Sequence, residues 1–315
     1  MNTYKIKLKT MFNFAITGVA GYIAPKHLQA IKDTGNNLVA ALDPHDSVGI
    51  LDQYFPNASF FVEFERFERH LDLLRRKSDS ERVHYLSICS PNFLHDSHIR
   101  LALRIGADAI CEKPIVLNPW NLDALEKIEI ETGKKVYTIL QLRVHPTIIE
   151  LKNKIAEAIR KNPNAKFNIK LDYITSRGLW YDFSWKGVIE KSGGVATNIG
   201  IHFFDMLIWI FGEPVHSIII ENQKRSMRGE LELKHASVNW HLSINYEDLP
   251  DEIKKMNKRT YRSIKINEEE LEFTEGFTNL HTVVYRNILS GNGYGITDAR
   301  PSIELVYKIR NGINF

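Results

Sequence analysis

The stretch MFNFAITGVAGYI (residues 11–23) decides the fold of the N-terminal half of the chain. Its first half is an apolar run typical of a buried strand. Its second half is a glycine-containing turn, after which a helix is expected over about 22–32. The next apolar run, NLVAALD (37–43), predicts a second buried strand that ends in Asp43. A strand, a turn, a helix and a second strand are the unit from which parallel sheets are built.

The same alternation continues along the chain. Further strands are expected over 83–90, 107–114 and 135–141, with helices over 64–76, 95–105 and 118–132. This order predicts a doubly wound parallel sheet with right-handed crossovers. Ligands of such sheets bind beyond the carboxyl ends of the strands. Those ends carry Gly18, Asp43, Ser90, Glu112 with Lys113, and Gln141.

The pattern changes after a helix expected over 146–161. The segments that follow alternate apolar and polar residues, as half-buried strands do. They are 166–177, 215–222, 229–234, 236–245, 259–266 and 271–275, with helices over 193–211, 277–289 and 301–311. We therefore predict an α/β protein: an extension (1–10), a Rossmann domain (11–143), and an α+β domain (144–315) with an open, mostly antiparallel sheet. The α+β domain is expected to hold the substrate and the subunit contacts, and its last helix can pack back on the first domain.

Composition argues against several classes of protein. The net charge of the 315 residues is +3 and there is no dense basic run, so no nucleic-acid partner is expected. The basic start lacks the apolar region of a signal peptide, and no later stretch is long and apolar enough to suggest a membrane partner. Cys89 and Cys111 end buried strands, so no disulfide is expected and a cytoplasmic location fits best.

The turn GVAGYI (18–23) is a partial match to the dinucleotide fingerprint G-x-G-x-x-G. Gly18 holds the first position, Ala20 and Ile23 replace the other glycines, and Gly21 is additional. Asp43 is placed to accept hydrogen bonds from ribose hydroxyls, and its charge would repel a 2′-phosphate, which favours NAD over NADP. The alternative is an ordinary turn followed by a surface aspartate.

A second stretch, GGVATNIGIHFFD (193–205), starts with paired glycines and continues as an apolar helix. Asn198, His202 and Asp205 follow at spacings of four and three, so they share one face of that helix. Buried polar groups need partners, so this face is expected to form the wall of a site. A hydrogen-bonded core histidine is the alternative for His202.

The motif Glu112-Lys113-Pro114 ends a predicted strand at the ligand edge of the sheet. Pro114 keeps Lys113 out of the helical region, so the lysine is expected to point into the crevice between the domains. A solvated surface lysine is the alternative.

These motifs together resemble the glucose–fructose oxidoreductase/inositol dehydrogenase family. The resemblance rests on GVAGYI, SPNFLH (90–95), EKP (112–114) and GG followed by NIGIHFFD, and it covers nearly the whole chain after the extension. Further segments are similar to one branch of the family, the UDP-N-acetylglucosaminuronate 3-dehydrogenases of bacterial surface-polysaccharide (O-antigen) synthesis. They are GYIAPKH, LDPHDSVGI, CEKPIVLNPWNLDAL, LQLRVHP, KSGGVATNIGIHFFD and KRTYRSI.

The resemblance implies an enzyme that oxidises the sugar C3 hydroxyl with NAD, and whose bound NADH a second substrate, 2-oxoglutarate, can reoxidise. It implies a homotetramer, and it maps the two residues that flank the reacting carbon onto Lys113 and His202. Two departures are Ile23 at the third glycine position and Asn198 where many relatives carry aspartate. A dehydrogenase of a free sugar or cyclitol, or a non-catalytic NAD-binding sensor, remains as an alternative.

Position and resemblance together assign the remaining residues. The cofactor set is Gly18, Ala20, Gly21, Tyr22, Ile23, Asp43, His45, Ser90, Pro91, Asn92, His95, Glu112, Lys113, Gln141 and Trp180. The substrate set is Lys113, Arg143, Arg177, Thr197, Asn198, His202, Arg259 and Arg262, in which arginines serve a carboxylate and a diphosphate. No metal is expected, because His202 and Asp205 lack a third ligand at a recognised spacing.

The chemistry requires a base near the sugar hydroxyl. His202 is expected to be that base, because an ordinary histidine pKa is about 6.5. An ordinary lysine pKa is about 10.4, so Lys113 would need a large downward shift to serve as a base. Lys113 is therefore expected to hydrogen-bond the C3 oxygen, and Asp205 either orients His202 or serves packing.

Overall fold

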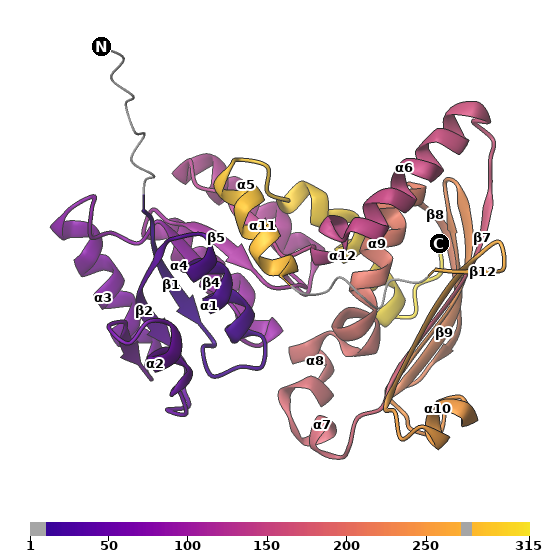
Figure 1. The fold of residues 1–315 in the computed structure, drawn as a ribbon, viewed down its shortest axis with the longest axis horizontal. Coiled ribbons are helices and arrows are strands. Elements are labelled where there is room, and N and C mark those ends of the chain that lie inside the picture. The colour runs from indigo at the N-terminus through magenta and orange to yellow at the C-terminus, as the bar shows by residue number, and fades with distance from the viewer. Residues whose placement is uncertain (1–10, 272–278) are drawn as a thin grey trace, which may run out of the picture.

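In the computed structural model, which describes residues 11–271 and 279–315, the apolar runs of the first half form a six-stranded parallel sheet (Figure 1). Its order is β3-β2-β1-β4-β5-β6. The strands are β1 (Asn13–Thr17), β2 (Asn37–Leu42), β3 (Ser59–Phe61), β4 (Tyr85–Ile88), β5 (Asp108–Cys111) and β6 (Val136–Thr138). The predicted parallel sheet is confirmed. Only β3 was not predicted, because its three residues are too few to show a periodic pattern.

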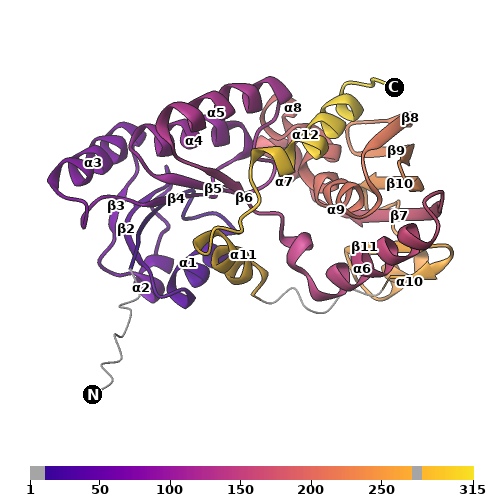
Figure 2. The same ribbon diagram turned by 90° about the horizontal axis from the view of Figure 1, so that it is seen from above.

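Helices cover both faces of this sheet (Figure 2). Before the second domain these are α1 (Ala24–Asp33), α2 (Ile50–Tyr54), α3 (Phe64–Lys77), α4 (His95–Arg104) and α5 (Pro119–Thr132). One face carries α1 and α2, and the other carries α3, α4 and α5. The Rossmann architecture follows from strands that are buried on both sides.

The second domain holds a six-stranded mixed sheet of order β12-β11-β7-β10-β9-β8. All neighbours are antiparallel except β7 and β10. Its strands are β7 (Phe167–Thr175), β8 (Pro214–Asn222), β9 (Ser226–Leu233), β10 (Ala236–Ser243), β11 (Thr260–Ile266) and β12 (Glu269–Glu270). The mostly antiparallel sheet is confirmed. The predicted strand over 271–275 and the extension over 1–10 lie outside the described residues, apart from Leu271.

The helices α6 (Pro146–Lys161) and α9 (Ile201–Phe211) pack on one side of this sheet. The ring of Phe204 in α9 meets the Trp240 ring of β10 edge-on at 5.5 Å. Three short helices complete the domain: α7 (Trp180–Phe183), α8 (Ile189–Ser192) and α10 (Asp251–Lys255). The first two carry the chain into α9.

The helical run Ile189–Phe211 is 23 residues long and, by length and composition, apolar enough to cross a membrane. This corrects the expectation that no such stretch exists, although the helix predicted over 193–211 already covers most of the run. In the part of the chain that the structure describes, 78% of the run's most apolar window is buried inside the protein. This degree of burial is typical of a helix in the core of a protein domain.

After the second sheet the chain returns to the first domain. Helix α11 (Leu280–Leu289) packs against α1, and its Tyr285 joins the core around Phe14 of β1. Helix α12 (Ile296–Arg310) then packs against both α5 and α9, and so lies between the domains. The predicted boundary at 143/144 therefore marks the change of pattern, whereas the first domain also contains residues from near the C-terminus.

Candidate active site

The glycine turn closes against the end of the neighbouring strand β4. Gly18 has a φ of +77°, and a Cβ there would lie 2.6 Å from backbone atoms of Cys89 and Ser90, so only glycine fits. The Gly18 amide donates to the Leu42 carbonyl at 2.8 Å, which places the turn at the carboxyl ends of three strands. Ile23 precedes α1 and packs on the first-domain core, where the fingerprint has its third glycine. A helix N-terminus behind such a turn is suited to a pyrophosphate.

Backbone amides hold Asp43 beside this turn. Its Oδ2 accepts from Ala20 N at 3.0 Å and its Oδ1 from His45 N at 2.9 Å. Each carboxylate oxygen has a second lone pair for a ribose hydroxyl. The side chains of Tyr22 and His45 are exposed beside the turn. The predicted arrangement of the turn and Asp43 is therefore present, and it fits a dinucleotide.

The segment after β4 is fixed by two histidines. The ring nitrogens of His95 lie 2.8 Å from the Ser90 carbonyl and 2.6 Å from the Pro114 carbonyl. His95 is buried and both nitrogens face backbone oxygens, so its side chain links two strand ends, and its predicted place in the cofactor site stays a prediction. The Ser90 hydroxyl lies 2.9 Å from Nδ1 of His98, a contact that the sequence did not indicate.

Asn92 and Lys113 each reach from the Rossmann domain to the second domain. Asn92, which follows Pro91, donates from Nδ2 to the Ser192 carbonyl at 2.9 Å. Lys113 donates from Nζ to the Asn198 carbonyl at 3.1 Å. The Lys113–Pro114 peptide bond is cis. The predicted position of Lys113 between the domains is therefore present in the structure.

The side chain of Glu112 contacts two histidines from distant parts of the chain. Its Oε1 accepts from Nε2 of His27 at 3.0 Å and from Nε2 of His281 at 2.9 Å. These histidines come from α1 and α11, so this oxygen belongs to a buried cluster, and the predicted cofactor role of Glu112 stays a prediction. The sequence did not indicate the cluster, because its residues are widely separated along the chain.

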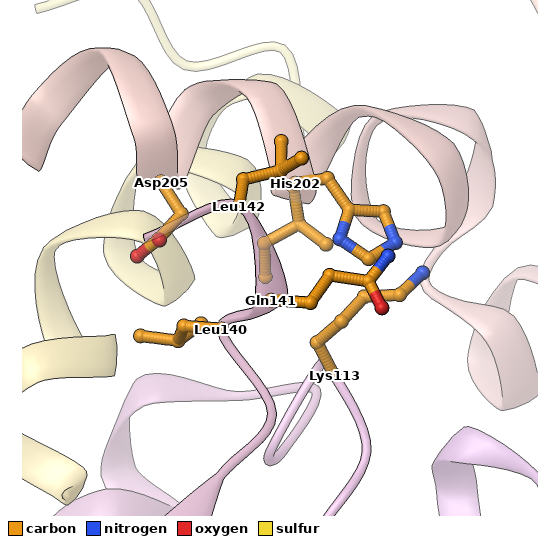
Figure 3. Close-up of a pocket in the computed structure, with 7 residues that line it drawn as sticks. Lys113, Leu140, Gln141, Leu142, His202 and Asp205 are labelled. Carbon is orange, nitrogen blue, oxygen red and sulfur yellow. The ribbon is translucent and has the colours of Figure 1, made fainter. Parts of the chain in front are cut away.

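Lys113, Gln141 and His202 gather at one cavity, together with Asp205 and the apolar residues Leu140, Leu142 and Ile201. In Figure 3 the Gln141 amide, the Lys113 side chain and the His202 ring point toward one another, whereas the Asp205 carboxylate points away. Asp205 therefore does not orient His202.

Burial controls the protonation of both predicted catalytic groups. Burial lowers the pKa of Lys113 to about 8, with Glu112 opposing this effect and Lys186 adding to it. Burial and then the neighbouring Lys113 charge hold the pKa of His202 well below its ordinary value. His202 is thus a neutral imidazole at neutral pH, and Lys113 is within reach of its neutral amine form.

Asp205 has a different partner from the one considered for it. Arg143 donates from Nε and Nη2 to the two Asp205 oxygens at 2.9 and 2.8 Å, and it also contacts Asp298. Arg143 and Asp205 are 5% and 3% exposed, so this is a buried ion pair. The prediction that Arg143 binds substrate is corrected, because its guanidinium is engaged within the fold.

The predicted polar face of the histidine helix is only partly present. Residues Ala196–Gly200 form a π-helix, and this wider turn changes the direction of the preceding side chains relative to α9. Asn198 donates from Nδ2 to the Tyr181 hydroxyl at 2.9 Å, and Thr197 is fully buried. The Asn198 side chain is therefore not among the residues that line the cavity with His202 and Asp205, although its carbonyl accepts from Lys113 Nζ.

Four further predicted residues are Arg262, Arg177, Arg259 and Trp180. The Arg262 guanidinium lies 5.8 Å from the Tyr173 ring centroid, and its charge contributes to the lowered pKa of His202. Arg177 is partly exposed beyond β7, whereas Arg259 is exposed. Trp180, in α7, is half-exposed.

Lys186 was missed by the sequence analysis. Its Nζ lies 5.4 Å from the Trp180 ring centroid, and its charge lowers the pKa of Lys113. It lies in a stretch of short helices (180–192) with no periodic pattern, so no signal in the sequence indicated it.

Comparison with known proteins extends this description. Residues 12–139 match the model of the oxidoreductase family, NAD-binding Rossmann fold, and residues 166–248 match that of the oxidoreductase family, C-terminal alpha/beta domain, both of the GFO/IDH/MocA type. The solved WlbA (WbpB) dehydrogenase from Thermus thermophilus, in complex with NAD and alpha-ketoglutarate, is 49% identical with a TM-score of 0.90, over 95% of both chains. A second structure of this dehydrogenase, in complex with NAD and UDP-GlcNAcA, has 48% sequence identity and a TM-score of 0.90, again over 95% of both chains.

Curated relatives are more distant. The D-glucoside 3-dehydrogenase of Escherichia coli (strain K12) is 27% identical over 64% of this chain and 54% of its own length. The inositol 2-dehydrogenase of Rhizobium meliloti (strain 1021) is 27% identical over 65% of this chain and 56% of its own length. The chain spans about half the length of the curated relatives it matches.

Proposed function

The chain belongs to the GFO/IDH/MocA family of oxidoreductases, with an NAD-binding Rossmann domain, and on that premise we propose that it oxidises the C3 hydroxyl of UDP-2-acetamido-2-deoxyglucuronate to the 3-keto sugar. The observation that carries the proposal is the cavity where Lys113, with a pKa of about 8, meets a neutral His202. The similarity to the Thermus thermophilus dehydrogenase supports the choice of substrate.

The residues of the chain divide the reaction between them. NAD, when bound at the glycine turn and Asp43, supplies the hydride acceptor. The neutral amine of Lys113 takes the hydroxyl proton, because a base works best when its pKa is near the working pH. His202, whose pKa is lower, is the weaker base and holds the hydroxyl by a hydrogen bond. This reverses the roles that the sequence suggested.

The charges that act on Lys113 and His202 fit an acidic substrate. Lys186 and Arg262 are partly exposed cations whose charges reach Lys113 and His202, and the charge of partly exposed Arg177 reaches Lys186. Such groups suit a carboxylate and a diphosphate. Exposed Arg259 can serve the diphosphate from a neighbouring subunit of a homotetramer, which sedimentation equilibrium would test.

We further propose that 2-oxoglutarate reoxidises NADH in place, so that the cofactor stays bound between turnovers. The Thermus thermophilus enzyme solved with NAD and alpha-ketoglutarate supports this step. Denaturing the purified protein should release nicotinamide in stoichiometric amount. Protein that carries none, and that needs external NAD for each turnover, would contradict in-place recycling.

A substrate panel tests the main proposal. UDP-2-acetamido-2-deoxyglucuronate should give reduced nicotinamide, whereas inositol and glucose should give none. The distant similarity to dehydrogenases of glucosides and inositol makes these the controls of choice. No reduction with any compound would support the alternative of a non-catalytic NAD-binding sensor.

A further inference from the structure

Behind Lys113 lies a buried cluster that the reaction described above does not use. It consists of His27 from α1, Glu112 at the end of β5 and His281 from α11. The three residues are 0%, 8% and 6% exposed, and Glu112 Oε1 accepts from both histidines. A carboxylate buried to this degree needs such donors to remain ionised.

The hydrogen bonds of the cluster fix where its protons lie. An ionised carboxylate only accepts, so both histidines present N–H at Nε2. The other nitrogen of His27, Nδ1, is 2.7 Å from the Tyr285 hydroxyl, which is 2.6 Å from the Ser87 hydroxyl. Burial lowers the pKa of His27, so Nδ1 accepts from Tyr285. The negative charge of the cluster therefore lies on Glu112.

These contacts account for the three groups without a metal ion. Their ligand atoms lie within 4.8 Å of one another, as metal ligands do. However, Oε1 already accepts two hydrogen bonds of 2.9 and 3.0 Å, which gives each ligand atom a partner. A hydrogen-bonded anion is therefore the simpler description of the cluster.

The anion directly adjoins the catalytic amine. The second oxygen of Glu112, Oε2, accepts from the Lys113 backbone amide at 3.3 Å. Burial pushes the pKa of Glu112 upward, but the two histidine hydrogen bonds outweigh it and hold this pKa well below its ordinary value. The negative charge in turn opposes the effect of burial on the pKa of Lys113.

Other groups also face Lys113. Lys186 of the segment before α8 adds a positive charge, His202 of α9 adds a neutral ring, and the Asn198 carbonyl accepts a hydrogen bond. Among these described neighbours Glu112 is the group that favours the ammonium form through its charge. The protonation of Lys113 therefore depends on whether Glu112 stays ionised.

We propose that His27 and His281 are positioning residues for the reaction: they hold one ionised carboxylate behind Lys113 and thereby set the fraction of Lys113 that is a neutral amine. The proposal rests on the role given to Lys113 in the proposed function. Helix α11 follows the second domain in sequence, and through His281 it would influence the protonation of Lys113.

The test is a titration of Lys113 itself, without substrate. Trace acetylation with acetic anhydride across pH, measured on the Lys113 peptide by mass spectrometry, gives the midpoint, with exposed Lys255 as internal reference. Wild-type protein should give a midpoint near 8. Glu112→Gln should lower it by about 1 pH unit or more, because an opposite charge is lost.

The role of His281 is tested by two variants of different severity. His281→Leu removes a donor and should lower the Lys113 midpoint less than Glu112→Gln does. His281→Gln keeps an N–H near the former Nε2 and should stay close to wild type. Thr282→Val is the matched control: Thr282 also fastens α11 to α1, through Asp33 at 3.1 Å, but does not touch Glu112. It should lower the melting temperature without moving the midpoint.

The outcomes separate this inference from the proposed function. An unchanged midpoint in Glu112→Gln overturns it, whatever the turnover. Stoichiometric zinc in the purified wild type that disappears in His281→Gln also overturns it. A shifted midpoint in a protein that oxidises no nucleotide sugar supports the inference and rejects the proposed function.

Discussion

The glycine turn of the Rossmann domain (18–23) and the histidine helix of the second domain (193–205) fix their polar groups by different means. In the turn, backbone amides hold Asp43, so the geometry depends on the path of the main chain. In the helix, side chains from distant segments fix the polar residues, as Arg143 does for Asp205. Substitutions in the turn region should therefore affect cofactor binding, and those in the helix region should affect stability or chemistry.

The largest effect is expected at the group that links the two regions. Lys113→Ala should lower kcat by roughly 100- to 10,000-fold or more, because it removes the proposed base. His202→Asn should lower kcat by a smaller factor. In the wild type, kcat/KM should rise with pH toward a plateau above about 8, since Lys113 must lose its proton. Steady-state rates across pH check this. A Lys113→Ala enzyme at wild-type rate would remove the central residue of the mechanism.

Asp205 should show the next largest effect, on stability. Asp205→Ala leaves the buried Arg143 cation without its bidentate partner and should cost about 3 kcal/mol of unfolding free energy. Denaturant unfolding measures the loss. Asp298→Asn is the control, because that carboxylate is 3.4 Å from Arg143 and partly exposed, so it should cost much less. Equal losses of unfolding free energy in both variants would show that the Arg143–Asp205 ion pair is not the main stabilising contact of Arg143.

Asp43 tests the turn in isolation. Asp43→Ala should weaken NAD binding by about 1.5–3 kcal/mol, because hydrogen bonds to a charged acceptor are lost. The fold should change little, since Ala20 and His45 amides can bond to water. Calorimetric titration with NAD and a thermal melt separate the two effects. Unchanged affinity would remove Asp43 from the cofactor site.

The smallest expected effect is at Asn198. Asn198→Asp should raise KM for the uronate by an amount equivalent to about 1 kcal/mol, through repulsion between like charges. UDP-N-acetylglucosamine, which has the same diphosphate but no carboxylate on its sugar, should be affected much less. Asn198 bonds to Tyr181, so equal losses with both sugars would indicate that Asn198 only shapes the pocket.

The same contrast explains what the sequence could predict. The parallel sheet, the NAD domain and the family were predicted correctly, because buried strands, a glycine turn and short motifs are local signals. Lys113 was placed at the domain boundary for the same reason: a proline ends its strand.

The errors concern contacts between distant segments. Arg143 was assigned to substrate because its spacing gives no sign of Asp205, 62 residues away. The histidine partners of Glu112 were not predicted, because α11 reaches Glu112 only after the chain returns to the first domain. Asn198 was grouped with His202 because a π-helical turn has no signature in a 3.6-residue pattern.

The most direct test of the account is the absorbance of NAD-loaded enzyme in the reduced-nicotinamide band when UDP-2-acetamido-2-deoxyglucuronate is added. The account predicts a rise in wild type that 2-oxoglutarate then reverses, and no rise on the same timescale in Lys113→Ala. A rise with inositol or glucose but none with the nucleotide sugar would contradict it.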